Sequence, residues 1–176
     1  MPFGYGGSKM TLVLGIDPGT ATTGYGFVRQ RDDDSLEAIA YGVISTPAKM
    51  AAHKRLIMIY DQLNELLLLH RPERCAVEKL FFQRNVTTAI AVGQARGVVM
   101  LALAQAGMDP AEYTPNEIKL AVAGYGAAGK KQVQEMVRML LELESIPRPD
   151  DAADALAVAI TYIHSARMQS LANYQE

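Results

Sequence analysis

The chain has 176 residues, of which 49% are hydrophobic and 20% are charged, and its net charge at neutral pH is −2. This composition excludes intrinsic disorder and collagen-like repetition, and the length suits one domain with its own hydrophobic core. The single cysteine, Cys75, excludes an intramolecular disulfide and a zinc ribbon, and this sparing use of cysteine is typical of a cytoplasmic protein.

The first residues and the longest apolar run predict neither a signal peptide nor a membrane-spanning segment. Residues 1–10 lack the apolar stretch of a signal peptide, so we expect a disordered leader there. Three polar side chains interrupt the apolar run Ala89–Ala106, and we therefore expect no membrane-spanning segment. We expect one domain over residues 11–166 and a flexible tail over residues 167–176.

Apolar periodicity predicts three strands in a row, then helix, strand, helix and strand, and helices at the end. Short apolar runs bounded by turn residues indicate strands, and apolar residues at helical spacing indicate helices. In chain order we expect strands over Thr11–Asp17, Thr22–Arg29 and Leu36–Ser45, a helix over Ala52–His70, a strand over Arg74–Leu80, a helix over Thr87–Gly107, a strand over Ala111–Thr114, and helices over Asn116–Ala123, Lys131–Leu143 and Asp151–Ala166. This order predicts an α/β domain with a mixed five-stranded sheet flanked by helices.

Two carboxylates stand near the ends of predicted strands. Asp17 ends the first strand, at the edge of the sheet where α/β proteins place their ligands, although a turn-forming aspartate would fit equally well. Glu78 interrupts an apolar strand, where a buried carboxylate is costly unless it is paired or bound to a cation. The alternative is a glutamate at a sheet edge that faces water or pairs with Lys79.

Two more carboxylates share one face of the last predicted helix. Asp151 and Asp154 are three residues apart, and the two alanines between them leave room for a bulky polyanion. Acids at a helix N-terminus also stabilise the helix dipole, but Asp150 already fills that role. With Asp17 and Glu78 they form an oxygen-only ligand set that suits Mg²⁺ or Mn²⁺. Two such ions can clamp the attacking and leaving oxygens of a phosphodiester.

Aromatic and basic side chains accompany these acids. Phe81 and Phe82 follow Glu78 in a predicted loop, where an exposed ring could stack on an unpaired base, and the alternative for either ring is a core position. Basic side chains there and in the later helices would position a phosphate backbone without reading its sequence, or form an ordinary solvated surface. These basic residues are Arg84, Lys119, Lys130 and Lys131.

Four segments together resemble one known family. They are LGIDPGTATTGYGFV, VEKLFFQRN, VGQARGV and DAADALAVAIT, and they resemble the RuvC family of bacterial Holliday-junction endonucleases from about Thr11 to His164. One acid-tipped strand would be a weak match, because such strands occur throughout ribonuclease-H-like proteins. Four segments in the same order and at similar separations are specific.

The resemblance implies a ribonuclease-H-like fold and a homodimer that nicks two strands of like polarity in four-way DNA junctions, with two Mg²⁺ or Mn²⁺ ions per active site and 5′-phosphate products. It implies RuvA and RuvB, the branch-migration proteins, as partners. It places the junction-contacting aromatic residue at Phe81 and the DNA-contacting lysines at Lys119 and Lys130. It places the catalytic and metal-binding acids at Asp17, Glu78, Asp151 and Asp154.

Three other functions are consistent with parts of the sequence. The segment Gly15–Thr20 is similar to the first phosphate loop of actin-like and sugar-kinase-like ATP-binding proteins, which have two related lobes. A junction-binding module without catalysis would use the acids for structure only. A hydrolase of RNA–DNA hybrids would share the chemistry and differ in substrate.

Gly93 and Gly97, one turn apart on a predicted helix, suit either a dimer contact or packing within the chain.

Overall fold

The computed structural model describes residues 11–79 and 86–173. Strands and helices follow one another in the order that the sequence predicted. In chain order the elements are β1 (Thr11–Asp17), β2 (Thr22–Gln30), β3 (Leu36–Ser45), α1 (Ala52–His70), β4 (Arg74–Glu78), α2 (Val86–Gln105), β5 (Ala111–Tyr113), α3 (Pro115–Ala123), α4 (Lys130–Leu140) and α5 (Asp150–Asn173).

The five strands form one mixed sheet in the order β3-β2-β1-β4-β5. β1, β2 and β3 are consecutive antiparallel neighbours, whereas β4 runs parallel to β1 and β5 runs parallel to β4. α1 and α2 are therefore the helices of the connections that lead to β4 and β5. This arrangement confirms the predicted fold class.

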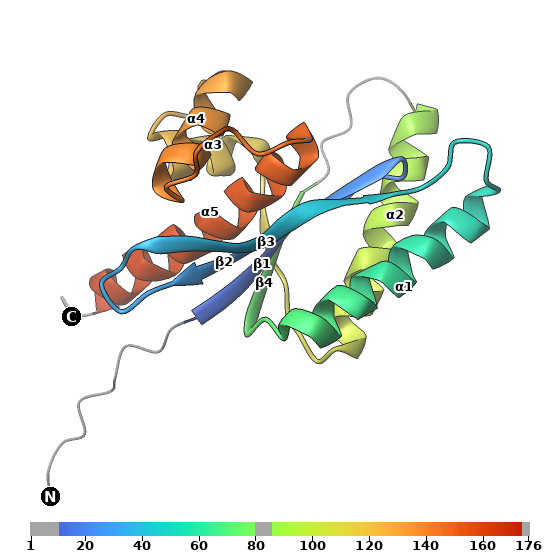
Figure 1. The fold of residues 1–176 in the computed structure, drawn as a ribbon, viewed down its shortest axis with the longest axis horizontal. Coiled ribbons are helices and arrows are strands. Elements are labelled where there is room, and N and C mark those ends of the chain that lie inside the picture. Colours follow the sequence, from blue (N-terminus) through green and yellow to red (C-terminus); the bar gives the residue numbers. More distant parts are fainter. Residues whose placement is uncertain (1–10, 80–85, 174–176) are drawn as a thin grey trace, which may run out of the picture.

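Helices cover both faces of the sheet (Figure 1). α1 and α2 pack on one face, and α3, α4 and α5 lie on the other. Alternation along β1 feeds both cores, since Leu14 and Ile16 face α1 and α2 while Val13 faces α5. Each layer has a continuous buried core, so the central strands are apolar on both faces.

α5 lies unusually close to β1 and β2 because glycines occupy the crossing. A Cβ atom on Gly15 would lie 2.1 Å from the carbonyl oxygen of Ala155, and one on Gly24 would lie 2.0 Å from that of Asp151. No side chain fits at either position without moving the helix backbone. The glycines in the two strands therefore set the distance of α5, and of its acids, from the sheet.

Several element ends differ from the predicted ones. β4 ends at Glu78 instead of residue 80, and α4 ends at Leu140 instead of residue 143 because Glu142 adopts a positive φ of 52°. α5 continues to Asn173, so most of the segment predicted as a flexible tail is helical. The predicted leader, residues 1–10, lies outside the described residues.

One helix among the described residues, over Thr87–Gln105, is long and apolar enough to cross a membrane by length and composition alone. In the structure this part of α2 buries Val99 and Leu103 in the core shared with α1 and the sheet. Its Arg96 side chain forms a 2.8 Å ion pair with Glu112 on β5. One face of the helix thus packs in the core while another face is exposed, and one such match is weak evidence for a span.

Candidate active site

Strand alternation places Asp17 and Glu78 side by side. Gly15 on β1 pairs with Ala76 on β4, and each acid lies two residues further along its own strand. Residues two apart point to the same face, so both carboxylates are on the face that α5 covers. Both end their strands, and carboxyl ends of parallel strands meet at the same edge of a sheet.

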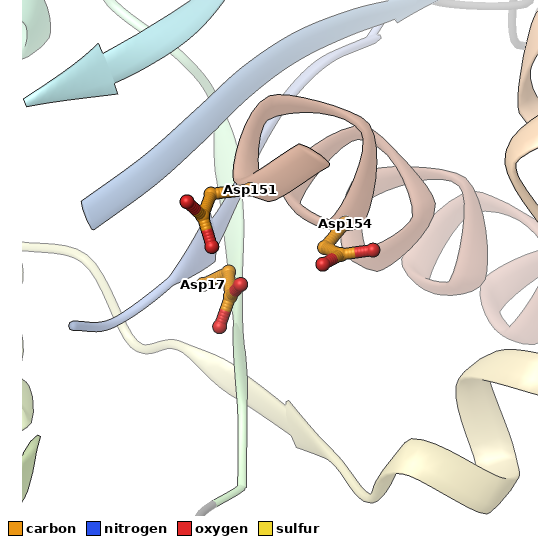
Figure 2. A group of neighbouring side chains, drawn as sticks. All are labelled: Asp17, Asp151 and Asp154. Carbon is orange, nitrogen blue, oxygen red and sulfur yellow. The ribbon is translucent and has the colours of Figure 1, made fainter. Parts of the chain in front are cut away.

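The first turns of α5 complete this group of acids. Asp17, Asp151 and Asp154 each offer a carboxylate oxygen, and these oxygens lie within 4.8 Å of one another. Figure 2 shows the Asp17 side chain at the end of β1, opposite the two aspartates of the helix. All three are half-buried, as is Glu78. The structure thus brings together four acids that are separated by more than 130 residues along the chain.

A cleft of about 280 Å³ opens beside these acids. Glu78, Asp154, Lys119 and Lys130 line it. The remaining lining is apolar, from α3, α4 and α5. Lys131 is exposed and is not among the residues that line this cleft.

Burial raises the pKa of Asp17 well above its ordinary value of 3.8, and the charges of Glu78 and Asp154 raise it further. The Asp17 carboxyl also hydrogen-bonds to Glu78, which favours a proton on Asp17. Burial likewise raises the pKa of Glu78 and of Asp154. Without a cation, ionisation of these acids is therefore unfavourable, because their negative charges would lie close together in a partly buried place.

Lys130 brings one positive charge to the group of acids. Its ammonium nitrogen lies 3.2 Å from Asp154 and 3.4 Å from Asp150. Asp150 in turn accepts a hydrogen bond from Arg148. The attraction of Lys130 partly offsets the effect of burial on the pKa of Asp154. The sequence indicated both Lys130 and Asp154, but no spacing rule predicted that they would be in contact.

A threonine that the sequence analysis did not select also contacts the acids. Thr22 Oγ1 donates a 2.8 Å hydrogen bond to Asp151 Oδ2. Thr22 begins β2, and 129 residues separate it from Asp151. Nothing in the local sequence distinguishes it from its neighbours Thr20 and Thr23, so only the tertiary structure reveals the contact.

The donor set fits a hard divalent cation. Three carboxylate oxygens lie within 4.8 Å of one another, and no cysteine or histidine belongs to the group found among the described residues. Mg²⁺ and Mn²⁺ prefer such oxygen ligands, and a bound cation would relieve the repulsion that raises these pKa values. Asp17, Asp151 and Asp154 are placed to hold it, with Glu78 adjacent.

Three of the residues predicted to contact DNA lie outside the described part of the chain. They are Phe81, Phe82 and Arg84, in the segment between β4 and α2. Of the other three, the structure places Lys119 and Lys130 at the cleft and Lys131 on the exposed first turn of α4.

The fold and the site together define a protein of the ribonuclease-H-like class, with a carboxylate cluster at the carboxyl ends of its central strands. Residues 13–162 match the family model of the crossover junction endodeoxyribonuclease RuvC. The chain is 55% identical over 158 residues to the RuvC protein of Syntrophomonas wolfei, covering 90% of this chain and 91% of that one. It is 55% identical over 154 residues to that of Heliobacterium modesticaldum, covering 88% and 94%. The chain belongs to the RuvC family of crossover junction endodeoxyribonucleases.

Solved structures agree with this assignment. Thermus thermophilus RuvC in complex with Holliday junction substrate matches with a TM-score of 0.82 and 37% identity, over 89% of this chain and 96% of that one. The yeast mitochondrial Holliday junction resolvase Ydc2 matches with a TM-score of 0.71 at 13% identity, over 94% and 83%. The second match shows a shared fold only.

The raised pKa values predict that cation binding weakens as the pH falls. Protons compete with the cation for carboxylates, and these carboxyls take up protons at pH values above their ordinary range. We expect the dissociation constant for Mn²⁺, measured by calorimetry over a pH series, to rise as the pH is lowered, with proton release on binding. A constant affinity over this series would contradict the acid cluster as the binding site.

Proposed function

We propose that this protein resolves four-way (Holliday) DNA junctions by nicking two strands of like polarity, in a reaction that needs divalent cations. The observation that carries the proposal is the convergence of Asp17, Asp151 and Asp154 within 4.8 Å, in a chain of the RuvC family. The Thermus thermophilus relative, solved with a Holliday junction substrate, supports the choice of substrate.

The chain's own residues explain how a strand would be held for cleavage. Asp17, Glu78, Asp151 and Asp154 are the proposed catalytic acids. Glu78 and Asp154 line the cleft, Asp17 and Asp151 lie beside Asp154, and Lys119 and Lys130 present positive charge to a phosphate entering the cleft. Two Mg²⁺ or Mn²⁺ ions held by these acids would activate the attacking water and stabilise the leaving 3′ oxygen, which leaves 5′-phosphate ends. When DNA arrives, Lys130 can exchange Asp154 for a phosphate oxygen.

Phosphate contact by the cleft lysines predicts a measurable salt dependence. Changing Lys119 to alanine should weaken junction binding at all sequences and reduce the slope of log affinity against log salt by about 1, because one fewer phosphate is neutralised. Fluorescence anisotropy over a salt series measures this slope. Arg74→Ala, at the opposite end of β4 from Glu78, is the control and should leave the slope unchanged. An unchanged slope in Lys119→Ala would remove Lys119 from the DNA interface.

We further propose that the protein acts as a homodimer through the exposed face of α2. Ile90 and Leu101 on this face are 58% and 52% exposed. Gly93 and Gly97 lie between them, and Cβ atoms added there would meet nothing within 4 Å. A second copy of the helix can therefore approach closely along an apolar stripe. A two-fold dimer would direct two active sites at equivalent strands of a nearly two-fold junction.

A charge on the α2 face should separate the two copies without unfolding either. Gly97→Arg adds its side chain into open space in the single chain, so we expect a folded monomer in light scattering. Junctions should then receive unpaired nicks. Leu171→Arg, at an exposed position near the end of α5, is the control and should remain dimeric. A dimeric Gly97→Arg variant would place the interface elsewhere.

Cooperation with the branch-migration proteins RuvA and RuvB, and location in the cytoplasm, complete the proposal. Both follow from family membership, and the free, buried Cys75 is consistent with a reducing compartment. The ATP-binding alternative has less support. Those proteins have two related lobes, whereas residues 11–79 and 86–173 contain one sheet with its helices.

The remaining alternatives differ from the proposal in substrate or in catalysis. Purified protein should be incubated with a four-way junction, a linear duplex and an RNA–DNA hybrid, with Mg²⁺, with Mn²⁺ or with chelator. The proposal expects cleavage of the junction only, and only with a cation. Cleavage of the hybrid would identify a hybrid hydrolase instead. Junction binding without cleavage under either ion would indicate a binding module.

A further inference from the structure

We propose that Thr22 is a positioning residue for the proposed metal site, because it fixes the orientation of the Asp151 carboxylate. This inference rests on the proposed function, since it concerns the same acids. Its basis is the 2.8 Å hydrogen bond from Thr22 Oγ1 to Asp151 Oδ2.

The backbone around this contact is held firmly on both sides. Thr22 pairs with Ser45 in the ladder between β2 and β3. Two residues further along β2, Gly24 allows the first turn of α5 to lie against the strand, at a distance where a Cβ would be 2.0 Å from the Asp151 carbonyl oxygen. The separation between the hydroxyl and the carboxylate is therefore set by the sheet and by helix packing. Thr22 is also β-branched, which restricts its χ1 rotamers.

The hydrogen bond constrains one carboxylate oxygen and leaves the other available. A hydroxyl donor to Oδ2 holds the plane of the Asp151 carboxylate, which lies in the same group as the carboxylates of Asp17 and Asp154. Partners of this kind, which bind a metal's ligands and not the metal, commonly change metal affinity by about 10- to 100-fold when removed.

Thr22 differs in charge from the other groups that contact the acids. Lys130 binds Asp154 as a cation, so it competes with a metal ion for that carboxylate. The Thr22 hydroxyl is neutral and leaves the negative charge of Asp151 intact. It therefore orders a ligand without competing for the site, which is the property expected of a positioning residue.

The test compares three variants by Mn²⁺ binding, measured by calorimetry and by the electron paramagnetic resonance signal of free Mn²⁺. Thr22→Val keeps the shape and removes the hydroxyl, and we expect its Mn²⁺ affinity to fall about tenfold. Thr22→Ser keeps the hydroxyl and should bind within about twofold of the unmodified protein. Thr161→Val is the control, because the Thr161 hydroxyl donates to the Ala157 carbonyl within α5.

The outcomes separate this inference from the proposed function. Loss of affinity in Thr22→Val with rescue in Thr22→Ser, at unchanged melting temperatures, supports the positioning role. Unmodified affinity in Thr22→Val, or equal loss in Thr22→Val and Thr22→Ser, overturns it while leaving the metal site in place. If the unmodified protein and Asp17→Asn bind Mn²⁺ equally, the proposed metal site itself is wrong.

Discussion

Replacing Asp17 with asparagine should abolish strand cleavage and, at the same time, stabilise the metal-free protein. Asp17 belongs to the acid group, and a cation that it would help to hold would supply several kcal/mol of transition-state stabilisation. Losing about 4 kcal/mol corresponds to a rate reduction of about 1,000-fold. Junction binding should persist, because the cleft lysines remain.

The expected gain in stability follows from the direction of the pKa shift. Burial and the neighbouring acids raise the pKa of Asp17, so the folded state holds its proton more tightly than the unfolded state. Stability of the metal-free protein therefore falls as the pH rises from the ordinary value of 3.8 through the folded pKa. Asparagine is neutral and removes this loss of stability. A gain of about 1 kcal/mol in the free energy of unfolding would raise the melting temperature by roughly 2–4 °C.

Both effects can be measured on the same samples. Cleavage is followed under single-turnover conditions with saturating Mn²⁺, and unfolding is followed by calorimetry in chelator at neutral pH. Asp109→Asn, an exposed acid ahead of β5, is the control and should change neither quantity. Cleavage by Asp17→Asn at the unmodified rate would mean that the active site is elsewhere.

Replacing Gly15 with alanine should destabilise the fold and disturb the acids together. The added methyl group would lie 2.1 Å from the Ala155 carbonyl oxygen and 2.5 Å from the Ala159 nitrogen, and both are backbone atoms of α5. The helix must move as a unit, which we expect to cost about 3 kcal/mol, at the upper end of the usual range for overpacking. Because α5 carries Asp151 and Asp154, Mn²⁺ affinity should fall as well.

Chemical denaturation measures the loss of stability, and calorimetry measures the fall in Mn²⁺ affinity. Gly126→Ala is a matched control. The nearest atom to a Cβ added at Gly126 is 3.9 Å away, which is an ordinary contact distance. We expect this variant to unfold at the denaturant concentration of the unmodified protein. A Gly15→Ala variant with unchanged stability would contradict the close crossing of β1 and α5.

The apolar pattern was sufficient to predict the fold because its signals are local. Alternation in β1, helical spacing in α1 and the stop at Pro72 each involve only neighbouring residues. The sequence indicated each of Asp17 and Glu78 by its place near a strand end, whereas their side-by-side placement depends on the parallel pairing of β1 with β4. The helical extension of α5 beyond residue 166 was missed, because that segment carries few buried apolar residues to indicate it.

The supporting contacts of the site could not be predicted in the same way. The Thr22–Asp151 hydrogen bond joins residues that are 129 positions apart, and it depends on how closely glycines let α5 approach the sheet. The contact of Lys130 with Asp154 depends on the packing of α4 against α5. Such contacts arise from tertiary geometry, so the sequence indicated the acids but not the groups that orient or neutralise them.

The central claim is that two copies of this acid cluster cut a four-way junction in a coordinated way. The most direct measurement uses a junction whose four strands carry different fluorescent labels, cut with Mg²⁺ or Mn²⁺ and resolved on a denaturing gel. We expect nicks at symmetric positions in two strands of like polarity, and none with chelator. Tight binding of the junction with no nick under either ion would contradict it.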